Sequence, residues 1–357
     1  IIESNVIRYS MCAGITLGKY GDQWDNRAGS AEGYVGTIYR ALSNGWNKAT
    51  IGHHLVRGND ISHCEQGGVV GSLGGAFSTI TGNNIHDIHV MNWFSGAEMA
   101  GIKLHGAIDV VITHNHIYRT ALGVWLDWMA QGARVTGNLF HDNHWDIFFE
   151  VDHGPFLADN NLFLSPTSLS LNSQGGAFVH NIFAGAVKLY SFDGRETPFF
   201  RPHSTTLAGL HNNPGGDVRF YNNLFIQLPD LSLFDHARLP VWMDGNVFLD
   251  GAKPSRCEKN PLIAKGQRVP AFKLLEKHGH WCLRMKFEKA WTTERTRKLV
   301  TSELLGKAAI PDLPFEQRDG EPITISTDYF GNARDESNPT PGPFECPPYG
   351  SRNLDVW

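Results

Sequence analysis

Hydrophobic and polar residues alternate in short runs along the first 250 residues, and the runs return at a regular interval. Each unit carries an Asn, one further residue, and then Ile or Phe. The Asn residues of this repeat are Asn5, Asn59, Asn83, Asn115, Asn138, Asn161, Asn181, Asn223 and Asn246. From Asn59 onward they are separated by 24, 32, 23, 23, 20, 42 and 23 residues. An alternation of period two predicts strands rather than helices, and the repetition of one unit predicts a solenoid.

The repeat predicts an all-β fold in which short strands stack coil on coil into a parallel β-helix. No coil can bury its apolar face alone, so stacking builds a continuous core. The longer intervals are then coils with inserted loops. One Asn in each coil can stack as an internal ladder, because its amide both donates and accepts hydrogen bonds. We therefore expect the Asn series to be structural rather than catalytic.

Two segments interrupt the repeat and set the domain organisation. Residues 19–50 form an insertion between the coils of Asn5 and Asn59, with a short helix expected at about 32–44. The repeat ends near residue 250, and the rest of the chain is rich in Pro, Gly and Asp towards its end. We expect a parallel β-helix over 1–250 and a C-terminal β-rich appendage over 251–357, which packs on the helix or contributes to a β-sandwich.

Two of the alternating runs end in a carboxylate at the same position of their coils. "GVWLD" ends in Asp127 and "DIFFE" ends in Glu150, each twelve residues after the Asn of its coil. The apolar partners face the core, so both acids should face outward into an open groove. Neighbouring strands lie ~4.8 Å apart, which matches the ~5–5.5 Å between the acids of retaining glycosidases rather than the ~6.5–9.5 Å of inverting ones. At this distance one acid raises the pKa of the other, which suits a nucleophile and a general acid/base.

The same alignment extends the outward row on both sides of the acids. It places His105 beside Asp127, and Asn172 and then Tyr190 beyond Glu150. A second, parallel row holds Lys103, Trp125, Phe148, Ser170 and Lys188. Polar groups that bind hydroxyls, beside aromatic rings that cover the face of a sugar, suit a carbohydrate groove.

Each of these residues also has a structural interpretation, as a surface histidine, a packing tryptophan, a turn residue or a charge-balancing lysine. We nevertheless expect the two acids to be catalytic, because a carboxylate within the apolar run "IFFEV" is costly without a partner or a task. Trp24 and Asp25, in the insertion, can reach the groove but are not among our candidates. The expected substrate-binding residues are His105, Trp125, Trp128, His153 and Asn172.

Composition narrows the partners. Hydrophobic residues make up 41% of the chain and charged residues 19%, with a net charge of −5, so no nucleic-acid partner is expected. The chain has no run of eighteen apolar residues, so no membrane span is expected. The five cysteines form no C-x-x-C pair and no H-E-x-x-H motif occurs, so neither a metal nor another cofactor is expected. Buried free thiols suit a reducing compartment, and we expect a cytoplasmic location.

The first residues, "IIESNVIRYS", have no Met and no signal-peptide core, and they begin in the middle of a strand-and-turn unit. We expect that an N-terminal part of the full protein has been removed or lies on a second chain that completes the fold. The sequence leaves the oligomeric state open, a homo-oligomer included.

Several stretches resemble the β-xylosidases of glycoside hydrolase family 120. They are "EMAGIKLHGAID", "ATIGHHLVRGNDISHCEQGGVVGS", "DYFGNARDESNPTPGPFE" and, most specifically, residues 98–165. The resemblance implies a right-handed parallel β-helix with an additional β-sandwich. It also implies a retaining mechanism in which Asp127 is the nucleophile, Glu150 is the general acid/base and Glu98 binds a substrate hydroxyl. The chains of that family are longer than this one.

These observations predict a retaining, exo-acting β-xylosidase that hydrolyses xylo-oligosaccharides through a covalent glycosyl-enzyme intermediate. The resemblance, and not the composition of the groove, implies xylose as the sugar. Two alternatives stay open. The first is a polysaccharide lyase on the same solenoid, with Lys103 or Arg119 as the base. The second is a non-catalytic carbohydrate-binding β-helix, which would need no pair of acids in register.

Overall fold

The structure is a computed structural model, and it describes residues 1–19, 31–93, 98–264 and 272–357. Its described strands form three long parallel sheets, which we call sheets A, B and C. Sheet A has the order β1 (Ile2–Glu3), β4 (Leu55–Arg57), β7 (Thr79–Thr81), β10 (Val111–Thr113), β13 (Ala133–Thr136), β16 (Phe156–Asp159), β19 (Gln174–Val179), β24 (Gly216–Tyr221) and β26 (Val241–Asp244).

Sheets B and C run alongside it in the same stacking order. Sheet B consists of β2 (Val6–Arg8), β5 (Asp60–Ser62), β8 (Asn84–Ile88), β11 (His116–Thr120), β14 (Leu139–His141), β17 (Leu162–Phe163), β20 (Ile182–Phe183), β25 (Leu224–Ile226), β27 (Val247–Leu249) and β28 (Leu262–Ile263). Sheet C consists of β3 (Ala13–Lys19), β6 (Gly67–Ser72), β9 (Ala100–His105), β12 (Leu122–Asp127), β15 (Trp145–Glu150), β18 (Thr167–Asn172) and β21 (Ala186–Leu189).

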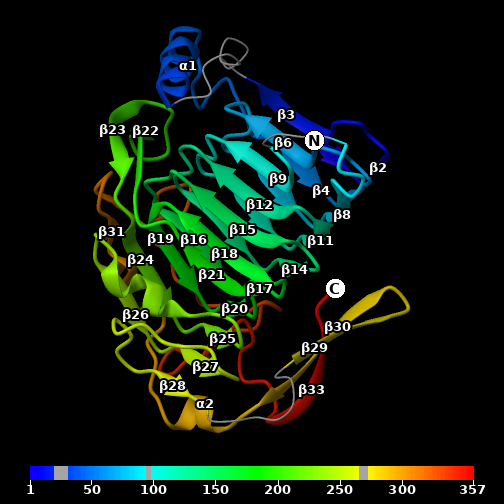
Figure 1. Cartoon of the computed structure of the whole chain (residues 1–357), viewed down its shortest axis with the longest axis vertical. Helices are drawn as coiled ribbons and strands as arrows, with labels where there is room; N and C mark the ends of the chain where they lie inside the picture. The colour runs from blue at the N-terminus through cyan, green and yellow to red at the C-terminus, as the bar shows by residue number, and fades with distance from the viewer. Residues whose placement is uncertain (20–30, 94–97, 265–271) are drawn as a thin grey trace.

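Successive strands of the chain visit the three sheets in turn, so that each round trip makes one coil of a parallel β-helix (Figure 1). Inward side chains at equivalent positions stack along the axis. Phe140, Phe163, Phe183, Phe225 and Phe248 form one such stack, with ring centroids 5.1 or 5.2 Å apart. The strand spacing brings equivalent rings of successive coils to a distance at which they can stack, because both features repeat once per coil. The all-β parallel β-helix predicted from the repeat is confirmed.

The predicted Asn ladder is also present. From Asn59 onward, the side-chain oxygen of each ladder Asn accepts hydrogen bonds from the backbone and the side-chain amide of the preceding one. Asn138 Oδ1, for example, accepts from Asn115 N at 2.9 Å and from Asn115 Nδ2 at 3.0 Å. At the far end the last Asn, Asn246, donates instead to the carboxylate of Glu258, at 2.6 Å from Nδ2. Burial raises the pKa of Glu258 to about 7, against the hydrogen bonds from Asn246. The ladder satisfies polar groups at a turn that stacking buries.

Two insertions project from the coils on one side of sheet C. The helix expected at about 32–44 is α1 (Ala31–Ser43). The long interval before Asn223 contains an antiparallel hairpin of β22 (Asp193–Phe200) and β23 (Leu207–Asn213). The helix and β22 contact each other, and Figure 1 shows both beside the ends of the sheet C strands. Apolar side chains of the first insertion pack there against Trp128, Val151 and Phe200.

The C-terminal part covers two faces of the solenoid. An antiparallel sheet of β29 (Phe272–Lys277), β30 (His280–Phe287) and β33 (Gly350–Asp355) packs on the outer face of sheet B. The segment with α3 (Ser302–Leu305), β31 (Lys307–Ala308) and β32 (Leu313–Pro314) runs back along sheet A. Short helices α2 (Ala290–Thr293) and η2 (Leu231–His236) complete the described elements. Sheet B continues to Ile263, so the stacked strands extend past the expected boundary at 250.

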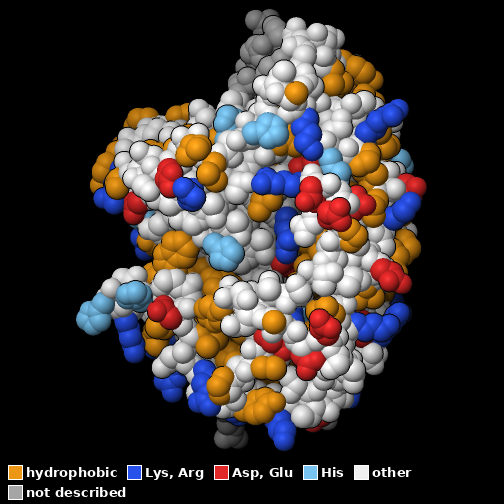
Figure 2. Space-filling model, turned by 180° about the vertical axis from the view of Figure 1, so that it is seen from behind, with side chains coloured by type: hydrophobic (Ala, Val, Ile, Leu, Met, Phe, Trp, Pro, Cys, Tyr) orange, Lys and Arg blue, Asp and Glu red, His pale blue; other side chains and the backbone are white. Residues whose placement is uncertain are grey.

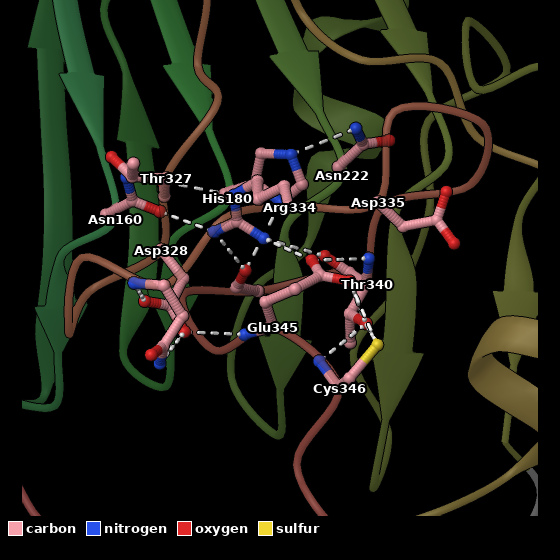
Figure 3. A network of polar contacts seen from close by, with 12 residues as sticks. Asn160, His180, Asn222, Thr327, Asp328, Arg334, Asp335, Thr340, Glu345 and Cys346 are labelled. Carbon is pink, nitrogen blue, oxygen red and sulfur yellow. Dashed lines mark hydrogen bonds and ion pairs between the residues drawn. The ribbon is translucent and has the colours of Figure 1, made fainter.

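A buried arginine fastens the last segment to the coils. Arg334 donates from Nη2 to Asn160 Oδ1 at 2.6 Å and from Nη1 to Glu345 Oε2 at 3.1 Å. Figure 3 shows it among the turns that follow β16, β19 and β24, where His180 contacts both Asn222 and the carbonyl of Gly342. Three coils and the C-terminal segment therefore share one hydrogen-bond network.

The five cysteines are free, but only Cys64 is buried, while Cys12 and Cys346 are exposed. The expectation of buried thiols was therefore wrong for Cys12 and Cys346, and Cys257 and Cys282 are only partly buried. Among the described residues there is no helix with the length and apolarity needed to cross a membrane. Figure 2 shows basic and acidic side chains interspersed over the face turned away from the viewer of Figure 1.

Candidate active site

Three neighbouring strands of sheet C end at candidate residues. β9 ends at His105, β12 at Asp127 and β15 at Glu150. The residue after each has a left-handed backbone, with φ of 63° at Gly106, 48° at Trp128 and 54° at Val151. Such a conformation is unfavourable for a β-branched residue such as Val. It turns the chain out of the sheet at once. The three polar side chains therefore lie side by side at the carboxyl ends of these strands.

The predicted register is confirmed. Asp127 pairs with Glu150, and their outer neighbours are His105 and Asn172 respectively. The second predicted row is also in register, through Lys103, Trp125, Phe148, Ser170 and Lys188. Because the two residues lie on adjacent strands, their Cα atoms are about 5 Å apart. Tyr190, which was expected to extend the first row, follows the last residue of β21 and is 43% exposed.

Asp127 divides its two oxygens between different environments. Oδ2 receives a hydrogen bond from Lys103 Nζ at 2.7 Å and lies 3.0 Å from His105 Nε2. Oδ1 is buried and is without a hydrogen-bond partner in the described part of the chain. Burial alone would raise the pKa of Asp127, but the charges and hydrogen bonds of Lys103 and His105 prevail and lower it to about 2. Asp127 is therefore an ionised carboxylate with one oxygen free to react.

The open groove expected around Asp127 is not what the structure has. The Asp127 side chain points away from the core, as predicted, yet it is only 8% exposed. Tyr34 of α1 covers this end of the sheet: its hydroxyl lies 3.3 Å from His105 Nδ1, and its ring stacks on Trp128 at 4.5 Å. The alternation of the strand could not reveal this cover, because it comes from the inserted helix.

Glu150 is held by two donors from opposite sides. Trp125 Nε1 donates to its Oε2 at 3.1 Å, and Arg195 Nη2 donates to its Oε1 at 2.7 Å. Burial and the charge of Asp127 raise the pKa of Glu150, against the lowering effect of Arg195. The two acids are thus driven apart in acidity, Asp127 towards the carboxylate and Glu150 towards the neutral acid. This is the pattern expected for a nucleophile beside a general acid.

Glu98, His105 and Asp127 come close enough to form a potential metal-binding group. A cationic side chain already lies among them, because Lys103 Nζ is 2.9 Å from Glu98 Oε2 and 2.7 Å from Asp127 Oδ2. The ammonium therefore contacts both carboxylates of the group. Glu98 is the most exposed member of the group, at 34% of its side chain, and offers its carboxylate to the outside.

The two tryptophans proposed as sugar platforms are partly occupied by protein groups. The ring of Trp125 lies between its register neighbours, with Lys103 Nζ 3.4 Å from one ring centroid and Phe148 stacked at 5.6 Å. Trp128 is 4% exposed and stacks on Tyr34. Trp125 contacts Glu150 directly, so its polar N–H joins the site as well as its ring.

The remaining predicted residues lie at different distances from the acids. Asn172, next to Glu150 in register, donates to Asp193 Oδ2 at 2.9 Å. His153 is 2% exposed, and it is hydrogen-bonded to Thr197 of β22 and to Gln174. It therefore supports the hairpin from behind instead of facing the acids. Trp24 and Asp25 lie outside the described residues.

Sequence reasoning missed Arg195, Asp193 and Tyr34. All three belong to insertions, where the repeat carries no information on position. The only signal available was the polar run "DGRE" in the long interval before Asn223.

Comparison with known proteins agrees with this architecture. A family model described as a right-handed beta helix region matches residues 37–185. A solved structure described as the complex of XylC with xylose is similar to this chain, with 33% sequence identity and a TM-score of 0.93 over 100% of this chain. This chain spans 61% of the length of that XylC chain. None of the curated proteins compared with the sequence matches it.

Proposed function

We propose that this chain carries the active site of a retaining β-xylosidase. Its resemblance to the β-xylosidases of glycoside hydrolase family 120 supports this, as does its similarity to the structure of XylC with xylose, which extends over 100% of this chain and 61% of that one. The observation that supports it most is the in-register pair of Asp127 and Glu150, one ionised and the other inclined to keep its proton. Adjacent parallel strands give the short separation that the retaining reaction uses.

In the proposed first step, Asp127 Oδ1 attacks the anomeric carbon of the xylosyl unit while Glu150 gives its proton to the glycosidic oxygen. The bond between that carbon and the leaving oxygen breaks, and a xylosyl ester of Asp127 forms. In the second step Glu150, now a carboxylate, takes a proton from water as the water attacks the same carbon. The ester bond breaks, and xylose leaves with its original anomeric configuration.

The neighbouring residues have proposed roles that follow from their contacts. Lys103 and His105 keep Asp127 ionised through its other oxygen, Oδ2. Glu98, the exposed carboxylate of the group, is suited to accept hydrogen bonds from sugar hydroxyls. The covered end of the sheet suits one terminal sugar, which is why we propose exo-acting hydrolysis of xylo-oligosaccharides.

The lyase alternative has less support. Arg119 is on β11 of sheet B, on another face of the solenoid, and pairs with Asp87 at 2.6 and 2.7 Å. Lys103 Nζ is already engaged by two carboxylates, Glu98 at 2.9 Å and Asp127 at 2.7 Å. The binding-only alternative remains a matter for an activity measurement.

The first experiment follows the stereochemistry of hydrolysis of an aryl β-xyloside by proton NMR. We expect β-xylose to appear first, followed by its slow mutarotation. Azide then separates the two acids. D127A should turn a dinitrophenyl xyloside into the α-xylosyl azide, whereas E150A should give the β-xylosyl azide. First-formed α-xylose, or full activity of D127A, would overturn the assignment. Products with ultraviolet-absorbing unsaturation would indicate the lyase, and binding without turnover a non-catalytic protein.

A further inference from the structure

Arg195 joins Glu150 to a second carboxylate, Asp193. Arg195 Nη2 lies 2.7 Å from Glu150 Oε1 and also 2.7 Å from Asp193 Oδ2. Its Nε lies 3.0 and 3.1 Å from the two oxygens of Asp193. Asn172 Nδ2 completes the group by donating to Asp193 Oδ2 at 2.9 Å. One guanidinium charge is therefore shared by two carboxylates, and Asp193 makes the greater number of contacts.

This sharing matters because Arg195 alone would work against a general acid. A full positive charge beside Glu150 favours its ionised form, in which it has no proton to give. Asp193 neutralises much of that charge, and burial together with Asp127 then keeps the pKa of Glu150 raised. Asp193 itself stays ionised: burial would raise its pKa, but hydrogen bonds from Arg195 and Asn172 lower it to about 2.

Three further titratable groups, from the coils, lie around Glu150. Asp127 of β12 raises its pKa and Lys103 of β9 lowers it. Asp152, in the turn after β15, is buried, and burial raises its own pKa well above the usual range. These groups belong to the coils, whereas Arg195 and Asp193 belong to the inserted hairpin. The hairpin is thus a separate source of charge at the general acid.

The contacts also distinguish the two oxygens of Glu150. Both oxygens face donors, but only the guanidinium is charged, and a cationic donor favours the oxygen that carries the negative charge. The oxygen that faces Arg195, Oε1, is therefore the one without a proton. The proton of the neutral acid then lies on Oε2, which accepts a hydrogen bond from Trp125 Nε1 at 3.1 Å.

The hairpin that carries Arg195 is firmly attached. Thr197, two residues further along β22, contacts His153 through both its hydroxyl, at 2.7 Å, and its carbonyl, at 3.1 Å. Burial lowers the pKa of His153 to about 4, so it is a neutral anchor near neutral pH. Gln131 binds the other end of β22, at the backbone of Phe200.

We propose that Arg195 and Asp193 form a positioning pair that holds the proton of Glu150 on Oε2 and sets how readily Glu150 releases it. The proposal deepens the proposed glycosidase function and rests on it for its catalytic consequence. When Glu150 gives up its proton, Arg195 stabilises the new carboxylate, and Asp193 prevents this stabilisation from removing the proton too early. The opposite signs of the two contributions make the pair testable.

The first test measures the titration of Glu150 without requiring turnover. The full chain is labelled with [δ-¹³C]glutamate, and the Glu150 signal is the one that E150Q lacks. R195M should raise the pKa of Glu150 by about one unit or more, and D193N should lower it. R195K, which keeps the charge but not the fork of donors, should fall between R195M and wild type. Arg201 is an exposed arginine that directly follows β22 of the same hairpin, and R201M should leave the titration of Glu150 unchanged. Equal or absent shifts in R195M and D193N would overturn the proposal.

The second test is the pH profile of kcat/KM. Xylobiose needs a proton on its leaving group. With this substrate the alkaline limb of the profile should move to higher pH in R195M and to lower pH in D193N. With a dinitrophenyl xyloside, which needs none, both variants should keep a rate within a few-fold of wild type, and a large loss there would indicate a merely structural role. If the wild-type protein hydrolyses neither substrate, the glycosidase proposal fails, and the titration alone still decides whether the pair controls Glu150.

Discussion

At the scale of single residues, the proposed nucleophile Asp127 has two oxygens in unlike surroundings. Lys103 and His105 both contact Oδ2, which leaves Oδ1 buried and unpartnered among the described residues. A buried acceptor without a donor costs about 1–3 kcal/mol. A bond from that oxygen to carbon would relieve the cost, so the arrangement that orients Asp127 would also favour the proposed attack by its other oxygen.

Lys103 is expected to keep Asp127 ionised in acid. K103M removes the charge that opposes burial, so the pKa of Asp127 should rise from about 2 by one unit or more. A nucleophile works in its ionised form, above its pKa. The acid limb of the pH profile of kcat/KM should therefore move to higher pH. K188M is the matched control, because Lys188 lies in the same row but is exposed and stacks on Trp145. An unmoved acid limb in K103M, or the same movement in K188M, would contradict this role.

The sequence was sufficient to predict which two acids face each other, but not their surroundings. The equal spacing of Asp127 and Glu150 from their ladder Asn residues fixes the register, because every coil repeats the same turn. Tyr34 and Arg195 lie on a helix and a hairpin that fold back from elsewhere, and no spacing records where such segments come to rest. The burial of Asp127 was missed for the same reason.

At the scale of elements, the coils are held in register by one amide per turn. Asn138 donates from Nδ2 to Ile112 O, Thr136 O and Asn161 Oδ1, at 3.0, 3.1 and 2.9 Å. The bonds to Ile112 and Asn161 join the coil to its two neighbours, so the ladder is satisfied only when the coils are stacked. This is why a simple repeat of Asn was enough to predict the fold. Glu258 then ends the series where no further Asn follows.

Removing one ladder amide should therefore destabilise the whole stack. N138A leaves several buried donors and acceptors unpaired, and we expect a loss of about 2–4 kcal/mol in the free energy of unfolding. N5A, at the exposed first position of the same ladder, should cost less than about 1 kcal/mol, since water can replace the lost bonds. Urea unfolding followed by tryptophan fluorescence measures both. Similar losses for the two variants would mean that the ladder is not a main source of stability.

At the scale of the whole molecule, the C-terminal segment acts as a strap across sheets A and B. Its apolar residues, such as Val300, Phe315 and Ile325, cover the outward faces of β16, β19 and β24. The sequence predicted that this part would be β-rich and would pack on the helix, but not its path. Its turns are irregular, and only tertiary contacts such as those of Arg334 determine where they dock.

Arg334 should be the most sensitive point of that strap. R334M leaves Glu345 buried, with 5% of its side chain exposed, and without its ion pair. Breaking a buried pair from one side costs about 3–5 kcal/mol. K307M breaks an exposed pair, Lys307 with Asp312, and should cost less than about 1 kcal/mol. Denaturant unfolding with limited proteolysis would test this. Early cleavage near residues 335–345 in R334M alone is the expected result, and equal resistance of both variants would contradict it.

The stacking of the sheet C strands also has a stereochemical consequence. Carboxylates at equivalent positions of one sheet in a solenoid are separated by whole multiples of the strand spacing, ~4.8 Å. One step suits retention, and two steps, roughly 9.6 Å, fall near the upper end of the inverting range. Glu150 and the position of His105 are two strands apart. Transferring the second acid from 127 to 105 would therefore leave room for a water molecule between sugar and base. Such a scaffold could exchange one anomeric outcome for the other by moving a single side chain by one coil.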